Sequence, residues 1–385
     1  MADRRTVLRR RRALLACAVV ALLAGVGVAV LTGDDGPAPR SSPRDKTGSP
    51  PGAPPARAER AAVDRLTLRQ RVGQLIVLRF AGTSPPGYVR AVLRERRAAG
   101  VILFRDNVAT PGQTRALTAA LRRAGGRPLV AVDQEGGEIR IVPWAPPAAS
   151  QGEQASAGTV GADASASATA LRGLGITVSL APVADVPTVA DAALGGRAFA
   201  SDPRDAARAL RAAVAGWRAG GVAATVKHFP GLGGATVNTD DGPAVVDRSR
   251  AQLEAVDLPP FAAAIDAGVP LVMVGHARYP ALDPDRIASQ SAPVIEGLLR
   301  DRLRFRGVVV TDSMEAAASV ATGSITATSE RAVRAGADLL LLTGKGSYAP
   351  VFQHLLAVAR RSPGFRARVR ASAARVLALK AAARR

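Results

Sequence analysis

The chain has 385 residues, of which 48% are hydrophobic and 3% aromatic; it is long enough for one large domain, and its Ala-, Val- and Leu-rich apolar content favours α/β packing over an aromatic-rich all-β fold. The formal net charge is +21, but the arginines that carry it are scattered and few aromatic residues lie between them, which argues against a nucleic-acid partner. The single cysteine, Cys17, excludes a disulfide framework and a cysteine-based metal site or nucleophile.

Residues 1–32 have the pattern of an export signal. The first twelve residues contain six arginines, and residues 13–32 then carry no charge, about the length that crosses a bilayer. Residues 4–8 also resemble a twin-arginine signal. No small-x-small cleavage site follows Thr32, so both a cleaved signal peptide and an uncleaved membrane anchor stay open. Either one predicts an extracytoplasmic location, membrane-anchored or secreted, with the basic end in the cytoplasm.

Residues 33–57 are rich in Pro, Gly, Ser and charged residues and are predicted to form a disordered linker. The predicted folded domain therefore covers residues 58–385. No second folded domain is expected.

Within that domain, eight short apolar runs alternate with helix-forming segments such as 206–219 and 292–302. The runs are Leu75–Phe80, Val101–Phe104, Leu129–Asp133, Val178–Val183, Ala224–His228, Leu271–His276, Val308–Asp312 and Asp338–Leu342. Most are continuous rather than alternating, as expected of parallel strands buried on both faces. Eight strand–helix units predict an α/β fold of the (β/α)8 TIM-barrel type, with an open doubly wound sheet as the alternative.

Several of these runs end in an ionisable residue. The endings are Asp133, Lys227-His228, His276 and Asp312. Taken singly, a strand-end Asp is often a helix cap and a lone His is often a hydrogen-bonded structural residue. Catalytic groups of such barrels lie at the carboxyl ends of the strands, and buried charges are costly unless they are paired or used. Two of the three histidines and two carboxylates at one barrel end therefore predict a functional site.

Six segments in this order resemble glycoside hydrolase family 3, specifically its bacterial β-N-acetylglucosaminidase branch. The resemblance spans roughly residues 66–379. It is carried by Asp133-Gln134-Glu135-Gly136-Gly137, Ala181-Pro182-Val183-Ala184-Asp185-Val186, Gly196-Arg197-Ala198-Phe199, Lys227-His228-Phe229-Pro230-Gly231, Val274-Gly275-His276 and Gly307-Val308-Val309-Val310-Thr311-Asp312-Ser313-Met314.

The resemblance implies a retaining exo-β-glycosidase that forms a covalent intermediate on Asp312. It implies a β-N-acetylhexosaminidase that releases terminal N-acetylglucosamine from cell-wall glycan fragments derived from peptidoglycan. The residues expected to bind the sugar are Asp133, Arg197, Lys227, His228 and His276. No metal or organic cofactor is expected, because neither a ligand-spaced His/carboxylate cluster nor a phosphate loop is present in the sequence. We expect a monomer.

One motif departs from the family. Where that branch has Asp-Ser-His, whose His is the general acid/base, this chain has Asn238-Thr239-Asp240. Three interpretations stay open. Asp240, or its neighbour Asp241, replaces the histidine as acid/base; the acid comes from elsewhere and residues 238–240 form a turn; or the protein has lost hydrolysis and only binds envelope glycan. A family 3 glycosidase of different sugar specificity is a further alternative.

Overall fold

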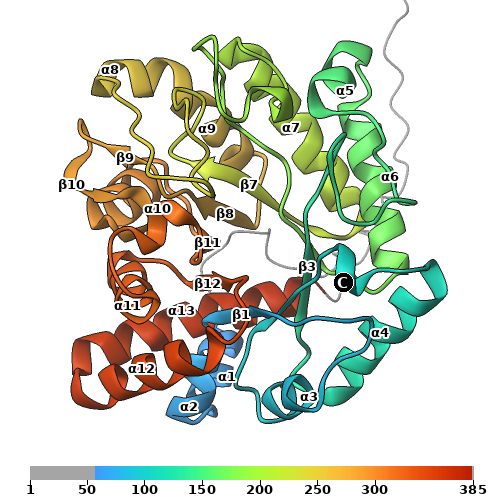
Figure 1. Cartoon of the computed structure of the whole chain (residues 1–385), viewed down its shortest axis with the longest axis vertical. Helices are drawn as coiled ribbons and strands as arrows, with labels where there is room; N and C mark the ends of the chain where they lie inside the picture. The colour runs from blue at the N-terminus through green and yellow to red at the C-terminus, as the bar shows by residue number, and fades with distance from the viewer. Residues whose placement is uncertain (1–56, 384–385) are drawn as a thin grey trace, which may run out of the picture. The chain divides into compact units, whose positions relative to one another are not determined.

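The computed structural model describes residues 57–383, and each of the eight apolar runs contains a strand. The strands form a closed barrel in which every neighbouring pair is parallel, and β1 pairs with β12 to close the ring (Figure 1). They are β1 (Ile76–Arg79), β2 (Gly100–Ile102), β3 (Leu129–Val132), β6 (Val178–Ser179), β7 (Ala223–Phe229), β8 (Leu271–Val274), β11 (Val308–Ser313) and β12 (Leu339–Leu342). The predicted (β/α)8 barrel is confirmed, and the open-sheet alternative is wrong.

Side chains of each strand alternate between two hydrophobic cores. On β12, Leu339 and Leu341 belong to the core inside the barrel, whereas Leu340 and Leu342 pack in the core between strands and helices. All four are buried, which explains why the sequence shows a continuous apolar run instead of an alternating one. On β7 the inward set includes Lys227, which lines the cavity at the end of the barrel.

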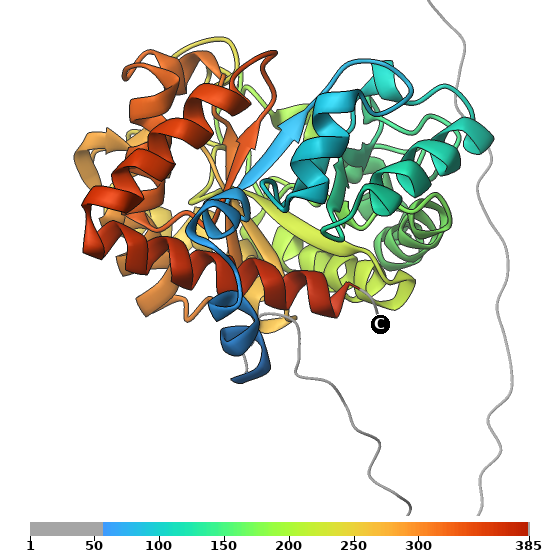
Figure 2. The same ribbon diagram turned by 90° about the horizontal axis from the view of Figure 1, so that it is seen from below.

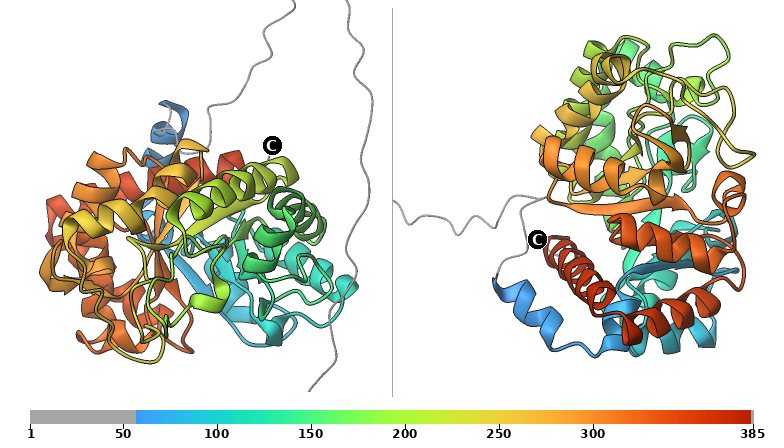
Figure 3. Two further views of the ribbon diagram at one scale, coloured as in Figure 1. Left: turned by 90° about the horizontal axis from the view of Figure 1, so that it is seen from above. Right: turned by 90° about the vertical axis from the view of Figure 1, so that its left-hand side faces the viewer.

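Helices surround the barrel as an outer layer (Figures 1 and 3). They are α1 (Arg57–Asp64), α2 (Leu68–Gly73), α3 (Gly87–Arg94), α4 (Pro111–Ala124), α5 (Gln151–Ala157), α6 (Val160–Gly173), α7 (Pro203–Gly220), α8 (Arg250–Gln252), α9 (Leu258–Asp266), α10 (Ala317–Val320), α11 (Ile325–Ala335), α12 (Tyr348–Arg361) and α13 (Pro363–Ala382). The helix predicted over 206–219 is part of α7. The one predicted over 292–302 is wound as a π-helix, η5 (Pro293–Arg302), and a second π-helical turn, η3 (Leu253–Asp257), precedes α9.

Short elements in the loops after the strands complete the fold. They are the hairpins β4 (Gln134–Gly136) with β5 (Ile139–Arg140) and β9 (Arg278–Tyr279) with β10 (Asp283–Ile287), and the 3₁₀ turns η1 (Arg105–Asn107), η2 (Gly195–Arg197) and η4 (Ala288–Gln290). Both hairpins follow directly on barrel strands, so they extend the carboxyl end of the barrel, where catalytic sites of such folds lie.

The long helix α13 covers the opposite, amino-terminal end of the barrel and packs beside α1 (Figure 2). Its Val376 and Leu379 join the core inside the barrel. The predicted export segment 1–32 lies outside the described residues, as does most of the predicted linker. Among residues 57–383, no helix is both long enough and apolar enough to span a membrane.

Candidate active site

A cavity of about 440 Å³ opens at the carboxyl ends of the barrel strands. Six of the seven predicted site residues line it, and they come from four different strand–loop segments: Asp133, Arg197, Lys227, His228, Asp240 and Asp312. Apolar groups such as Phe104 and Met273 complete the lining. The cavity wall therefore combines many converging polar and charged groups with a smaller apolar part, which suits a small polar ligand.

Asp312 lies on β11 with its two carboxylate oxygens in different surroundings. Oδ1 accepts a hydrogen bond from the Ser313 backbone N–H (2.8 Å), and Oδ2 is 3.9 Å from Nε2 of His228. Burial alone raises the pKa of Asp312, but the nearby His228 and His276 charges and the Ser313 hydrogen bond outweigh it, so the pKa lies below its ordinary value. Asp312 is therefore ionised at neutral pH.

Lys227 and Arg197 are held by carboxylates that close a charge network across the cavity wall. Lys227 Nζ is 2.7 Å from Asp133 Oδ1 and 2.6 Å from Glu135 Oε1. Arg197 donates twice to Glu135, from Nε at 2.8 Å and from Nη2 at 2.6 Å. Burial raises the pKa of Glu135, but Lys227 and Arg197 overcome this and lower it to about 2. Such a network fixes both cations at the cavity wall without leaving a buried charge unpaired.

His228 is oriented by Asp185, which is almost completely buried. Asp185 Oδ2 lies 2.7 Å from His228 Nδ1, and Oδ1 accepts from the backbone N–H groups of His228 (3.2 Å) and Leu232 (2.7 Å). With Nδ1 occupied, Nε2 is the nitrogen that faces Asp312. Asp185 and Glu135 were not predicted as site residues, although both stand inside the motifs that carry the family resemblance.

His276 does not line the cavity, contrary to its expected place among the sugar-binding residues. It is fully buried; its Nδ1 is 2.7 Å from Ser289 Oγ and its Nε2 is 2.8 Å from the Ser313 carbonyl oxygen. Both ring nitrogens are engaged, so no nitrogen is left for a sugar hydroxyl. The residue supports the backbone next to Asp312 instead.

Residues 238–240 form a turn that presents Asp240 to the cavity. Asn238 Oδ1 accepts from the Asp240 N–H (3.1 Å), and Ala317 and Ala318 donate to the carbonyls of Asp240 (3.2 Å) and Thr239 (3.0 Å). Partial burial and the charge of Asp312 raise the pKa of Asp240. Asp240 and Asp241 are both exposed, but only Asp240 lines the cavity, and this position distinguishes the two neighbouring aspartates.

Glu315, another carboxylate that was not predicted, also lines the cavity. Its Oε2 accepts from the backbone N–H of Thr343 (2.8 Å). A Glu only three residues beyond the predicted nucleophile could have been noted in the sequence. It is the candidate for an acid that comes from elsewhere than the 238–240 turn.

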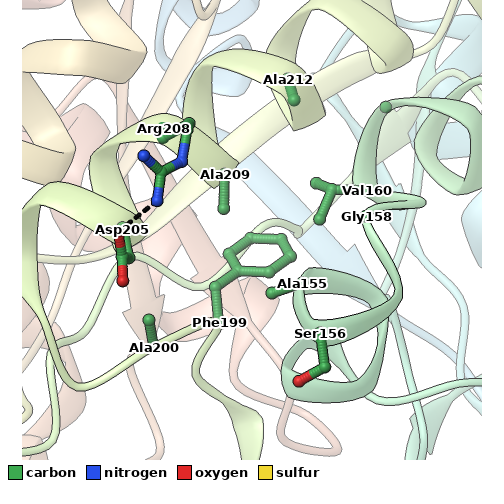
Figure 4. A pocket seen from close by; sticks show the side chains of 11 residues that line it. Ala155, Ser156, Gly158, Val160, Phe199, Ala200, Asp205, Arg208, Ala209 and Ala212 are labelled. Atoms are coloured by element: carbon green, nitrogen blue, oxygen red, sulfur yellow. Dashed lines mark hydrogen bonds and ion pairs between the residues drawn. The ribbon is translucent and has the colours of Figure 1, made fainter. Parts of the chain in front are cut away.

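A depression of about 430 Å³ on the side of the barrel lacks such a set of groups (Figure 4). It lies between α5, α6 and α7, and Phe199 and Ala209 are among its lining residues. Its charged side chains, Asp205 and Arg208, form an ion pair with each other. We assign it no part in the chemistry.

The closed parallel barrel and the ionisable cluster at its carboxyl end define the class of TIM-barrel enzymes. Within that class, the model of the glycosyl hydrolase family 3 N-terminal domain matches residues 67–379. The chain belongs to glycoside hydrolase family 3.

Individual relatives agree with this membership. A β-hexosaminidase of Xanthomonas oryzae pv. oryzae is 36% identical over 279 residues, covering 70% of this chain and 83% of the relative. The β-N-acetylhexosaminidase structure from Beutenbergia cavernae is 35% identical with a TM-score of 0.76, covering 82% of this chain and 99% of that one. A family 3 β-N-acetylglucosaminidase structure from Paenibacillus sp. has a TM-score of 0.77 at 34% identity; the match covers 83% of this chain but only 63% of that one.

Proposed function

We propose that this family 3 glycoside hydrolase is a retaining, exo-acting β-N-acetylhexosaminidase that removes terminal N-acetylglucosamine from cell-wall glycan fragments. The names of the β-hexosaminidase relatives support the sugar. A cavity of about 440 Å³ at the end of a closed barrel suits a terminal sugar better than the middle of a polymer.

The observation that carries the mechanism is the opposite pKa shift of two carboxylates in one cavity. The pKa of Asp312 is lowered and that of Asp240 is raised. A retaining glycosidase needs an ionised nucleophile and a protonated acid. Surroundings that lower the pKa of one carboxyl group and raise the pKa of another are typical of this pair of roles. We therefore assign the nucleophile to Asp312 and the acid/base to Asp240.

In this mechanism Asp312 attacks the anomeric carbon while Asp240 gives its proton to the departing oxygen. The bond to the aglycone breaks as the bond to Asp312 forms. Asp240, now a carboxylate, then takes a proton from a water molecule whose oxygen attacks the anomeric carbon. The bond between that carbon and Asp312 breaks, and the sugar leaves with its original stereochemistry. Asp133, Arg197, Lys227 and His228 hold the ring in position.

The cell-wall origin of the substrate and an extracytoplasmic location rest on the basic-then-apolar pattern of residues 1–32. A protein exported with this domain outside the membrane would meet wall glycans there. A glycan-binding protein without turnover is the alternative, because residues 238–240 lack the family's His.

Turnover of activated β-glycosides by the purified chain tests the proposal. We expect hydrolysis of aryl N-acetyl-β-glucosaminide, a preference for this over aryl β-glucoside, and a loss of several orders of magnitude in Asp312→Ala. Binding of N-acetylglucosamine without any turnover would favour the glycan-binding alternative. A preference for the glucoside would overturn the sugar assignment.

A further inference from the structure

The loop that carries Asp240 runs from the end of β7 toward α8, and residues 232–248 are called the Asp240 loop below. Its tip keeps its shape through its own backbone, because the N–H groups of Asp241 (2.9 Å) and Gly242 (3.1 Å) both donate to the Asn238 carbonyl oxygen. The place of the aspartate in the cavity therefore depends on how the whole loop is attached to the domain.

Arg248, the last residue of the Asp240 loop, holds the two ends of the loop together. Its Nη1 pairs with the carboxylate of Asp257, at the end of η3, and its Nη2 donates to Thr188 Oγ1 in the segment after β6. The same guanidinium lies against the start of the loop, since a Cβ on Gly234 would be only 2.9 Å from Arg248 Nε. One side chain thus contacts the start of the loop and fixes its end to two neighbouring segments.

The ion pair of Arg248 with Asp257 is shielded from solvent. The Asp257 side chain is 0% exposed and the Arg248 side chain is 11% exposed. The backbone just before the loop rests on this pair, because a Cβ on Gly231 would be 2.6 Å from Asp257 Cβ. A buried pair resists separation, since loss of one partner leaves the other charge uncompensated. The contact is therefore a firm attachment for the loop.

Arg248 differs in kind from the other attachments of the loop. Within residues 57–383, it is the one side chain of the Asp240 loop that forms a hydrogen bond or ion pair with a residue outside the loop. The others are backbone hydrogen bonds, such as those that Ala317 and Ala318 donate to the tip. A substitution can therefore remove the Arg248 contacts while the backbone bonds of the loop remain.

We propose that Arg248 is a positioning residue for the general acid, holding the Asp240 loop so that Asp240 reaches the departing oxygen. The inference rests on the proposed function, because Arg248 acts through the acid/base role of Asp240. Arg248 does not line the active-site cavity, so it makes no contact with the sugar. Its contribution is confined to proton transfer, whose rate depends steeply on the placement of the acid.

The test replaces both members of the buried pair, because a single replacement would leave one charge unpaired. Arg248→Met/Asp257→Asn removes both charges with little change in side-chain size. Arg368→Met/Glu296→Gln is the matched control: it removes an ion pair between α13 and η5, and neither residue lines the cavity. For the full-length chain and each variant, kcat/KM is measured on phenyl and dinitrophenyl N-acetyl-β-glucosaminide, and urea denaturation checks that each variant is folded.

We expect Arg248→Met/Asp257→Asn to lower kcat/KM on the phenyl glycoside by about 10- to 100-fold, the scale of a misplaced catalytic group. The dinitrophenyl glycoside should lose little, because its leaving group needs little protonation. In an Asp240→Ala background the same double replacement should cost nothing further on the phenyl glycoside, since the acid that it positions is gone. The control pair should leave the ratio of the two rates unchanged.

Thr188→Val is a milder variant that removes one acceptor of the same guanidinium from an exposed residue. It should shift the ratio of the two rates in the same direction, by a smaller factor. This variant keeps the buried pair intact, so it tests the proposal even if the double variant does not fold.

An equal loss on phenyl and dinitrophenyl glycosides in Arg248→Met/Asp257→Asn would overturn the positioning role, because it would show a general effect on the fold. A loss of the same size with and without Asp240, or an unchanged ratio in both Arg248→Met/Asp257→Asn and Thr188→Val, would also overturn it. All these results leave the proposed function standing, since the parent chain still hydrolyses the glycosides. A parent chain that hydrolyses no β-glycoside would be a failure of the proposed function, and the positioning role would fall with it.

Discussion

Two aspartates face the active-site cavity, and their surroundings differ. Asp312 accepts a backbone hydrogen bond and lies beside His228, whereas Asp240 has the negative Asp312 as a neighbour and no cation within hydrogen-bonding distance among the described residues. This difference gives each carboxyl group a separate role, and it leads to two predictions for single residues.

Asp240→Ala should slow hydrolysis of natural glycosides by about 10²- to 10⁴-fold, the usual contribution of a general acid. Substrates with good leaving groups need little protonation, so dinitrophenyl glycosides should lose less, and azide should restore turnover by attacking the intermediate without a base. Asp241→Ala is the control, because Asp241 does not line the cavity. Wild-type rates in Asp240→Ala combined with azide rescue in Glu315→Ala would move the acid/base role to Glu315.

Asp185→Asn tests whether His228 must be held by a carboxylate. The amide keeps the size of the side chain but removes the negative charge, and it has only one acceptor oxygen where Asp185 uses one for Nδ1 and the other for the two backbone N–H groups. We expect kcat/KM to fall by about 10- to 100-fold, the scale of a hydrogen bond to a charged group. Steady-state rates on an aryl glycoside measure this, with the exposed Asp191→Asn as control. An unchanged rate would show that Asp185 only stabilises the loop.

At the level of single residues, the sequence predicts strand-end positions well but not the contacts among them. Lys227, His228 and Asp312 end barrel strands, so their meeting at one cavity follows from the topology. The pairing of His228 with Asp185 joins residues 43 positions apart, and it depends on loop conformation that no periodicity encodes. His276 has the same strand-end position but contacts the β11 backbone, because side-chain direction beyond a strand end is set by local packing.

Among the elements, the barrel strands were predictable because buried parallel strands leave continuous apolar runs. The strand β6 is shorter than the predicted run: its regular ladder ends at Ser179, although Val183 still forms a parallel bridge with Lys227 of β7. The winding of η5 as a π-helix was not predictable, because apolar spacing does not separate it from an α-helix.

The contact between α13 and α2 contains a buried lysine, Lys380. Lys380 Nζ donates to Gln74 Oε1 (2.7 Å), and burial together with the charge of Arg96 lowers the pKa of Lys380 to about 7. The unfolded chain keeps an ordinary lysine pKa of about 10.4. Between these values the unfolded state binds more protons, so this group makes the folded state more stable as the pH rises, and the contribution is lost as the pH falls through 7.

Lys380→Met removes the titrating group while keeping the length of the side chain. Relative to the variant, the free energy of unfolding of the parent should therefore increase by up to about 1.4 kcal/mol for each pH unit between pH 7 and 10. Urea denaturation at several pH values measures the difference. The exposed Lys345→Met should run parallel to the parent. Parallel curves for Lys380→Met as well would contradict the assignment.

For the whole molecule, the basic start and the uncharged residues 13–32 predict export of the domain. In cells that produce the chain, protease added outside should digest the domain if it is anchored, or the domain should appear in the medium if it is released. A cytoplasmic marker protein serves as the lysis control. A domain that stays protected in intact cells and absent from the medium would contradict export.

The central claim is that the molecule forms a covalent glycosyl–enzyme intermediate on Asp312. A fluorinated N-acetylglucosaminyl donor, whose intermediate breaks down slowly, should load the protein with one sugar, and mass spectrometry of the digested protein locates the modified residue. We predict that the modified peptide contains Asp312 and that Asp312→Ala remains unlabelled. A label on Asp133, Asp240 or Glu315, or a chain that hydrolyses glycosides without accumulating any intermediate, would contradict this account.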